Sequence, residues 1–183
     1  MIQQQISNFI PANVLSQIHS DLVNKNQWVW RTHFWRYYLI DNLQPYKESD
    51  RNTWYGNQRS ALDASLQGPW KELFDSVFKL AGPNFVLQRY ALNGQTLGQE
   101  QEFHADTTPG LAGNYVSYLM YLNTEWDRSW GGETEFYKDG VIEKIYPDPG
   151  KLVVFDSQTQ HRGAGPTKPN TLRLSIVLHG QLV

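Results

Sequence analysis

Apolar side chains recur at helical spacing in two segments of the N-terminal half. In the first segment the regularly spaced apolar residues are Val14, Leu15, Ile18 and Leu22. This period predicts an amphipathic helix over about residues 12–24. The second segment begins at Pro69 and ends at Gly82, and its apolar residues are Trp70, Leu73, Phe74, Val77 and Phe78. Proline in the first turn and glycine after the last turn are typical helix boundaries, so we predict a second helix here.

The remaining pattern predicts strands and loops. Residues 28–40 are crowded with aromatic and branched side chains and predict a strand, whereas the polar residues 41–60 predict a loop that could border a site. From residue 84 onward, short apolar runs separated by turn residues predict strands near residues 85–91, 101–106, 115–122, 133–145, 151–156 and 171–178. We therefore predict a mostly β fold with flanking helices (α+β), in which a jelly-roll or cupin-like core is buttressed by the N-terminal helices.

The length of the chain suits one buried core. Of its 183 residues, 40% are hydrophobic and 19% are charged, which is typical of a folded globular protein. We expect a single domain over residues 1–183, in which residues 1–83 form a buttress of helices and strand and residues 84–180 form the β core. No internal repeat or linker divides the sequence.

Charge and cysteine content exclude several function classes. The net charge is -2 and no basic block is present, so no nucleic-acid partner is expected. The sequence has neither a secretory leader nor an apolar run long enough for a membrane span, which predicts a soluble, intracellular and cytoplasmic protein. Because the chain has no cysteine, any metal must be held by imidazole, carboxylate and water. The short chain would suit a bacterial or viral source.

Three residues of the β-rich half form a candidate metal site. His104 and Asp106 are two positions apart on a predicted strand, and alternate strand residues project from one face. His161 follows the strand KLVVFD and lies within reach of a partner strand in a rolled sheet. Two imidazoles and one carboxylate on one face of an octahedral ion leave three positions open, which suits an iron(II) that also binds a chelating cosubstrate and dioxygen.

The last predicted strand carries an inward-pointing arginine. In TLRLSIVLHG the apolar face is formed by Leu172, Leu174, Ile176 and Leu178, so Arg173 and Ser175 lie on the opposite face. A buried guanidinium requires a partner, and its planar fork matches a carboxylate. The pattern therefore predicts that Arg173 and Ser175 bind the far carboxylate of a dicarboxylate cosubstrate whose other end chelates the metal.

Each of these signals also has a structural explanation. A His-x-Asp pair is usually a surface pair, and a single inward arginine is usually part of a buried salt bridge. The combination of His104, Asp106, His161 and Arg173 on neighbouring predicted strands favours a functional site. His179 has the same alternation as Arg173, and it belongs either to a second layer around the site or to the core at the strand end.

Over about residues 84–180 the chain resembles the prolyl 4-hydroxylase-like branch of the iron(II), 2-oxoglutarate-dependent oxygenases. The segments that carry the resemblance, in order, are QRYALNG, FHAD, VSYLMYLNTEW, GGETEF, IYPDPGKLVVFDSQTQHRGAGP and TLRLSIVLHG. The resemblance implies a double-stranded β-helix that binds iron(II) through His104, Asp106 and His161. It also implies that Arg173, twelve residues after His161, binds 2-oxoglutarate.

The resemblance further implies the reaction and its cosubstrates. The expected enzyme is a dioxygenase that hydroxylates a C–H bond with 2-oxoglutarate and O2, forming succinate and carbon dioxide, and ascorbate is a candidate reductant. The carboxylate of Asp106 favours hydroxylation over halogenation. Tyr90 is a candidate for a hydrogen bond to the cosubstrate, as is Tyr118 or Tyr121, although buried tyrosines also serve as core.

Residues for the substrate are expected before the GGETEF turn. Trp126, Arg128 and Trp130 are candidate substrate contacts on a loop at the site edge, with ordinary loop packing as the alternative. The sequence departs from the family in two places. Collagen-type members usually have lysine where this chain has Arg173, and the stretch between Tyr90 and His104 is longer than usual, so that the loop near LNGQTLGQE could shape access to the site.

These observations leave three hypotheses. The first is a hydroxylase of a prolyl or other peptide side chain, or of a free amino acid or small metabolite. The second is a cupin-like metalloenzyme that does not use 2-oxoglutarate, which would give Arg173 no anion to bind. The third is a binding module that keeps only the fold, for which complete metal ligands have no use.

Overall fold

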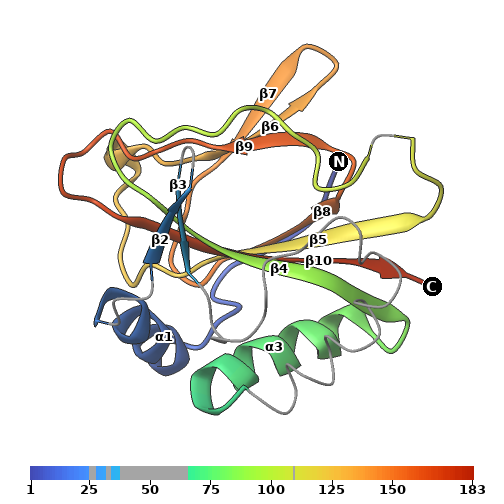
Figure 1. The fold of residues 1–183 in the computed structure, drawn as a ribbon, viewed down its shortest axis with the longest axis horizontal. Helices are drawn as coiled ribbons and strands as arrows, with labels where there is room; N and C mark the ends of the chain where they lie inside the picture. Colours follow the sequence, from blue (N-terminus) through green and yellow to red (C-terminus); the bar gives the residue numbers. More distant parts are fainter. Residues whose placement is uncertain (25–27, 32–33, 38–65, 109) are drawn as a thin grey trace.

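The computed structural model describes residues 1–24, 28–31, 34–37, 66–108 and 110–183. The described part of the chain forms two helices packed under a large sheet, with a smaller sheet on the other side (Figure 1). The mostly β fold with flanking helices that the sequence predicts is confirmed.

The large sheet is antiparallel and has seven strands. In spatial order they are β1 (Ile2–Ile6), β8 (Leu152–Asp156), β5 (Asn114–Tyr121), β10 (Arg173–Leu182), β4 (Phe85–Gln95), β3 (Phe34–Tyr37) and β2 (Trp28–Arg31). The small sheet contains β7 (Val141–Ile145), β6 (Thr134–Lys138) and β9 (Gln160–Gly163). A short 3-10 turn, η2 (Arg128–Trp130), precedes β6.

The two helices cover one face of the large sheet. They are α1 (Ala12–Asn24) and α3 (Gly68–Ala81), close to the predicted bounds. In α3 proline stands in the first turn, and the Gly82 N–H ends the helix by donating to the Phe78 carbonyl at 3.0 Å. The predicted apolar faces of both helices are buried against the sheet in one hydrophobic cluster, which forms the larger core.

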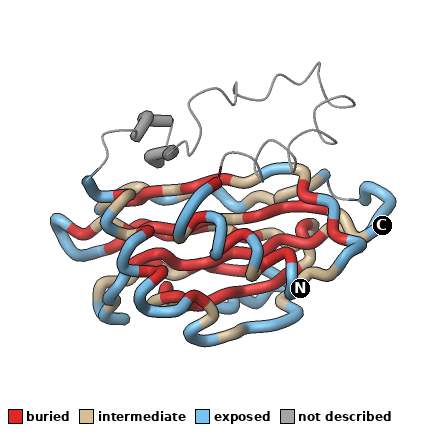
Figure 2. The backbone as a smooth tube through the Cα atoms, turned by 90° about the horizontal axis from the view of Figure 1, so that it is seen from below, coloured by how far each residue is buried: buried red, intermediate tan, exposed pale blue. Residues whose placement is uncertain are grey.

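A second core lies between the two sheets. Its members are Leu119, Tyr121, Phe136, Ile145, Val153 and Phe155. The rings of Phe136 on β6 and Phe155 on β8 meet edge to face with centroids 5.0 Å apart. Buried residues run along the strands through the middle of the molecule (Figure 2). The central strands β5, β8 and β10 are therefore buried on both faces, one toward the helices and one toward the small sheet.

Several predicted strands have different bounds in the structure. The predicted single strand over 28–40 is wrong, because Trp28–Arg31 and Phe34–Tyr37 are two strands that pair with each other. Residues 133–145 also form two paired strands, β6 and β7. Segment 101–106 is not a strand, since only His104 forms an isolated bridge there. The predicted loop over 41–60 lies outside the described residues.

Two strands have no counterpart in the prediction, and two are longer than predicted. β1 has the mostly polar sequence IQQQI, yet it pairs with β8 at the edge of the large sheet. β9 is short and polar, and it pairs with β6. β4 and β10 extend beyond their apolar runs because they pair with each other along nearly their whole length. Sheet context thus outweighs the intrinsic preference of Asn93 and Gly94 for turns.

Within the described ranges, none of the helices is long and apolar enough to cross a membrane.

Candidate active site

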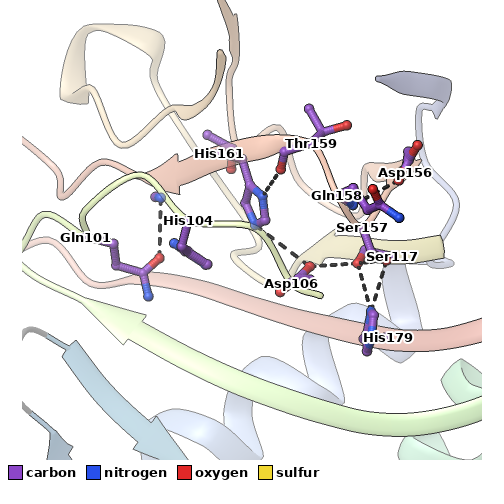
Figure 3. Close-up of polar contacts among 12 residues, drawn as sticks. Gln101, His104, Asp106, Ser117, Asp156, Ser157, Gln158, Thr159, His161 and His179 are labelled. Atoms are coloured by element: carbon purple, nitrogen blue, oxygen red, sulfur yellow. Dashed lines mark hydrogen bonds and ion pairs between the residues drawn. The ribbon is translucent and has the colours of Figure 1, made fainter. Parts of the chain in front are cut away.

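The three predicted metal ligands converge on the small-sheet side of the large sheet. His104 and Asp106 lie between β4 and β5, and His161 lies on β9. One ligand atom from each side chain can be chosen such that all three lie within 4.8 Å of one another. The Nε2 atom of His161 is 3.8 Å from Oδ2 of Asp106, and Figure 3 shows the His161 ring directed at that carboxylate. The structure therefore brings together the residues that the sequence predicts as a triad.

Hydrogen bonds to the backbone orient both imidazoles. Nδ1 of His104 lies 2.9 Å from the Glu102 carbonyl, and Nδ1 of His161 lies 2.9 Å from the Thr159 carbonyl. Because a carbonyl oxygen can only accept, each Nδ1 must carry the hydrogen. In the neutral imidazole, Nε2 then has the free lone pair with which histidine ligates a metal.

Asp106 is held at both carboxylate oxygens. The Ser117 hydroxyl donates to Oδ2 at 2.6 Å, and Arg89 Nη2 donates to Oδ1 at 3.1 Å and to the Asp106 carbonyl at 2.7 Å. Burial raises the pKa of the Asp106 carboxyl, but the charges of His161 and Arg89 and the Ser117 hydrogen bond lower this pKa by more. The net effect is a pKa below the ordinary value, so Asp106 is ionised at neutral pH.

A directed chain of hydrogen bonds leads from Asp106 into the large sheet (Figure 3). The only hydroxyl hydrogen of Ser117 goes to Asp106, so the 2.8 Å contact between Ser117 and Ser157 must be donated by Ser157. By the same reasoning, Nδ1–H of His179 donates to the Ser157 hydroxyl at 2.9 Å. Both serine side chains and His179 are buried. The chain delivers hydrogen-bond donors to the carboxylate and fixes its orientation.

Burial favours the neutral form of two histidines in this region, His161 and His179. Burial lowers the pKa of His161, and the nearby Asp106 charge opposes that shift only in part. Burial, with help from the Arg89 charge, lowers the pKa of His179 to about 4. The His161 ring also packs edge to face on Phe155, with centroids 4.8 Å apart. His161 is therefore neutral and held in place by packing, so it is available as a metal ligand at physiological pH.

Arg173 lies on the same face of the large sheet, at the start of β10. Its side chain is 2% exposed. Its four hydrogen bonds go to the Gly132 carbonyl (2.7 Å), Gln95 Oε1 (2.8 Å), Ser175 Oγ (3.2 Å) and Thr134 Oγ1 (2.8 Å). Every one of these acceptors is neutral. Within the described part of the chain, no carboxylate forms an ion pair with this guanidinium.

The turn before β6 is shaped around Arg173. Gly132 has φ +76°, and a Cβ there would lie 2.7 Å from the Trp126 ring and 3.4 Å from Cδ of Arg173. Only glycine fits both this backbone conformation and the space. The Gly131-Gly132 pair thus provides the tight turn expected from the sequence, and its second carbonyl accepts from Nε of Arg173.

The register of the strands decides which tyrosine faces the site. On β10 and its neighbours, Ser175 is aligned with Tyr121 of β5 and Asn93 of β4. The Arg173 guanidinium lies 5.3 Å from the centre of the Tyr121 ring. Oδ1 of Asn93 is buried and, among the described residues, is the one buried side-chain oxygen or nitrogen without a hydrogen-bond partner. Tyr121 and Asn93 are therefore the polar neighbours of Arg173 and Ser175.

Tyr90 and Tyr118 lie on the opposite face. Both are aligned with Leu178, on the side of the sheet that packs against the helices. The ring of Tyr90 meets Phe74 of α3 at 5.7 Å, and the ring of Tyr118 meets Phe85 at 5.1 Å. The structure does not bring these two predicted cosubstrate contacts to the site. Tyr90 and Tyr118 are close to the metal motif in sequence, but strand alternation places them on the face opposite to Arg173.

Of the three candidate substrate residues, Trp126 contacts the turn that packs on Arg173. Trp126 packs on Gly132 and donates its indole N–H to the Gly131 carbonyl at 3.0 Å. Arg128 extends toward Asp148, with Nη2 3.4 Å from Oδ2. Trp130 stacks under the Lys168 ammonium, which is 3.8 Å from the ring centre. The structure thus places Trp126 behind Arg173, and Arg128 and Trp130 in contacts within the outer loops.

The residues that support the ligands have weak sequence signals. Arg89, Ser117 and Ser157 lie within segments that carry the family resemblance and Gln95 follows one of them, but as single polar residues they do not stand out from their neighbours. Ser117 has one sequence signal, because it is a polar residue inside the apolar run of β5. It lies on the face of β5 opposite to Tyr118 and Met120. The others become visible only when the strands are aligned.

A mostly β fold that directs two imidazoles and one carboxylate to a common point defines a candidate metal centre of the two-histidine, one-carboxylate class. A family model described as the 2OG-Fe(II) oxygenase superfamily matches residues 85–179, which is more than half of the chain. The protein belongs to this superfamily of enzymes. A comparison with curated protein sequences gave no match.

Solved structures with the same fold include three prolyl hydroxylases. A prolyl-4-hydroxylase of Pseudomonas putida has a TM-score of 0.62 at 21% identity, covering 98% of this chain and 92% of that one. A Trichoplax adhaerens prolyl hydroxylase, in complex with a hypoxia inducible factor peptide fragment, has a TM-score of 0.65 at 18% identity, covering 98% and 83%. The viral collagen prolyl hydroxylase of Paramecium Bursaria Chlorella virus-1 has a TM-score of 0.60 at 14% identity, covering 98% and 95%.

Proposed function

We propose that this oxygenase holds iron(II) with His104, Asp106 and His161 and hydroxylates a C–H bond of its substrate. The observation that carries the proposal is the convergence of the three ligand atoms within 4.8 Å of one another. The donor set fits iron(II), because two imidazoles and an ionised carboxylate occupy one face and leave positions for other ligands. Bound iron(II) would supply the oxidative decarboxylation of 2-oxoglutarate to succinate and the hydroxylation driven by it.

Arg173 and Ser175 are proposed to bind the far carboxylate of 2-oxoglutarate. Arg173 is buried beside neutral acceptors, and a buried guanidinium is most stable when an anion pairs with it. Asn93 and Tyr121, which are aligned with Ser175, take the place of Tyr90 and Tyr118 as candidate polar contacts. The buried, unpartnered oxygen of Asn93 supports a ligand there, since such an atom is costly to leave unpaired.

The proposed substrate is a prolyl or other side chain of a peptide. This proposal is supported by the likeness to prolyl hydroxylases, one of them in complex with a peptide fragment and another named a collagen prolyl hydroxylase. Arginine at position 173 differs from the lysine usual in collagen-type members, so free amino acids and small metabolites are the second candidate substrates. The carboxylate of Asp106 favours hydroxylation over halogenation.

The fold supports a catalytic core of the double-stranded β-helix type, also called jelly-roll or cupin-like. Two antiparallel sheets face each other across the second core, and the triad lies at their border. We propose that residues 1–183 form one domain in which residues 84–180 are the core and residues 1–83 its buttress. The contact of the Trp70 indole N–H with Asp21, at 3.1 Å, joins the two helices of that buttress.

Turnover of 2-oxoglutarate tests the proposal. The protein, supplied with iron(II), ascorbate and O2, is expected to form succinate, whereas the His104→Ala variant is the blank. A screen of peptides and free amino acids for the gain of one oxygen by mass spectrometry would then identify the substrate class. Absence of succinate under every condition, together with absence of 2-oxoglutarate binding, would contradict the proposal and favour a cupin-like metalloenzyme that does not use 2-oxoglutarate.

A further inference from the structure

Gln95 is a fully buried glutamine in direct contact with Arg173. It lies on β4, aligned with Arg173 of β10, and its exposure is 0%. Its Oε1 accepts from Nη1 of Arg173 at 2.8 Å, while its Nε2 donates to the carbonyls of Gly163 at 2.9 Å and Gln99 at 3.0 Å. The guanidinium can only donate and the two carbonyls can only accept, so the orientation of the amide is fixed.

Gln95 connects the Arg173 guanidinium to the strand that carries His161. Gly163 follows His161 by two residues on β9, and a Cβ on Gly163 would lie 2.7 Å from Oε1 of Gln95. This contact leaves no space for a side chain at position 163. Gln95 therefore contacts both the Arg173 guanidinium and the backbone of the strand that carries His161.

Hydrogen bonds and close packing hold the lengthened segment 96–101 on β9. Gln101 exchanges two hydrogen bonds with Gly163, since its N–H donates to the Gly163 carbonyl at 3.1 Å and its Oε1 accepts from the Gly163 N–H at 3.3 Å. A Cβ on Gly165 would lie 2.8 Å from the carbonyl oxygens of Thr96 and Gln99. The segment therefore packs directly on the backbone of β9 and its continuation, beside Arg173.

A neutral amide at position 95 has an electrostatic consequence. A glutamate of the same shape would also accept from Arg173, but it would neutralise the guanidinium in a buried environment where ion pairs are strong. It would also lose the two hydrogen bonds that Gln95 donates to the carbonyls of Gly163 and Gln99. Glutamine fixes the orientation of the Arg173 guanidinium and leaves the positive charge of this group uncompensated. We propose that Gln95 is a positioning residue that sets the affinity of the site for 2-oxoglutarate by holding Arg173 without neutralising it. This inference rests on the proposed role of Arg173.

The test compares Gln95→Glu with Gln101→Glu. Both substitutions add one negative charge, but Gln101 accepts only from the Gly163 N–H, a bond that a carboxylate can also accept. Calorimetric titration of 2-oxoglutarate into the manganese(II)-loaded protein is expected to show roughly 100-fold weaker binding for Gln95→Glu. The affinity of Gln101→Glu should stay within about threefold of wild type. Manganese(II) affinity should be unchanged in both.

A second ligand separates the electrostatic role from a merely structural one. 2-Oxopentanoate keeps the chelating end of 2-oxoglutarate but has no far carboxylate, so its binding should be the same in wild type and Gln95→Glu. Equal weakening of both ligands, or equal 2-oxoglutarate affinity in the two glutamate variants, would overturn the inference. If wild type itself binds no 2-oxoglutarate, the proposed function fails instead.

Gln95→Met keeps the test decisive if Gln95→Glu does not fold. Methionine fills a similar volume and cannot accept from Arg173, so the guanidinium loses an anchor without losing its charge. We expect the KM for 2-oxoglutarate to rise about 5-fold to 10-fold, with kcat at saturating 2-oxoglutarate within about twofold of wild type. A folded Gln95→Met with an unchanged KM would overturn the positioning role.

Discussion

His104 and His161 exchange both of their backbone hydrogen bonds, although they lie in different segments of the chain. The N–H of His104 donates to the His161 carbonyl at 2.9 Å, and the N–H of His161 donates to the His104 carbonyl at 2.8 Å. The two rings consequently lie side by side, with centroids 4.6 Å apart. The backbone thus sets the separation of the two imidazoles.

Because backbone hydrogen bonds set the spacing of the two imidazoles, we predict that metal binding stabilises an already folded protein. The metal-free protein should unfold cooperatively, and manganese(II) at about 100 times its Kd should raise Tm by about 5–10 °C. His161→Ala removes one ligand and should show almost no shift, and a chelator should reverse the shift of wild type. A wild-type Tm that does not respond to metal, or an equal rise in His161→Ala, would contradict this assignment. Differential scanning calorimetry measures both.

The hydrogen bond from Ser117 to Asp106 predicts a supporting role in metal affinity. Ser117→Ala leaves Oδ2 of Asp106 without its 2.6 Å donor, and loss of such a supporting contact typically weakens metal binding about 10-fold to 100-fold. Ser157→Ala is the matched control, because Ser157 contacts Ser117 and His179 but not the carboxylate. Competition titrations with a metal-binding dye would measure both affinities. Equal effects of the two substitutions would show that Ser117 has no special role.

The sequence allowed the site to be predicted where chemistry and strand period agree. His104, Asp106 and His161 combine into one donor set, and the alternation on β10 placed Arg173 opposite the apolar residues. The prediction failed for Tyr90 and Tyr118 because their facing depends on register between strands, which spacing along one segment does not determine. Gln95 was overlooked for the same reason, since its partners come from β9 and β10.

The fold was predictable where apolar runs are long or regularly spaced. Both helices follow their 3.6-residue periodicity, and β5 and β8 follow their apolar runs. β1 and β9 were not predicted because their polar residues carry no such signal, and they become strands only through pairing with β8 and β6. Segment 101–106 alternates like a strand, but in the structure only His104 pairs.

The buried His179 predicts that stability falls in acid. Its pKa is about 4 in the folded protein against an ordinary 6.5, so the unfolded chain binds the proton first as the pH falls. Neutral His179 therefore contributes about 3 kcal/mol to the free energy of unfolding. This contribution is fully present above pH 6.5 and is lost as the pH falls toward 4. Urea denaturation of the metal-free protein at a series of pH values measures this loss.

The control for this prediction is His179→Gln, which keeps a hydrogen-bond donor for Ser157 but does not titrate. Its free energy of unfolding should depend less on pH between 4 and 6.5 than that of wild type. Groups that do not interact with His179 contribute equally to both proteins, so the difference between the two curves reports His179 together with its coupling to Asp106. Two parallel curves would show that His179 is not kept neutral by the fold.

The four hydrogen bonds of Arg173 predict that lysine is a poor substitute. Lysine preserves the charge, but its ammonium cannot contact the Gly132 carbonyl, Gln95 and Thr134 in the planar arrangement of a guanidinium. Arg173→Lys is expected to bind 2-oxoglutarate about 10-fold to 100-fold more weakly, and Arg173→Met more weakly still. Both should bind manganese(II) as wild type does, because Arg173 contacts none of the three metal ligands. Calorimetry with each ligand separates these effects, and wild-type 2-oxoglutarate affinity in Arg173→Met would refute the carboxylate-binding role.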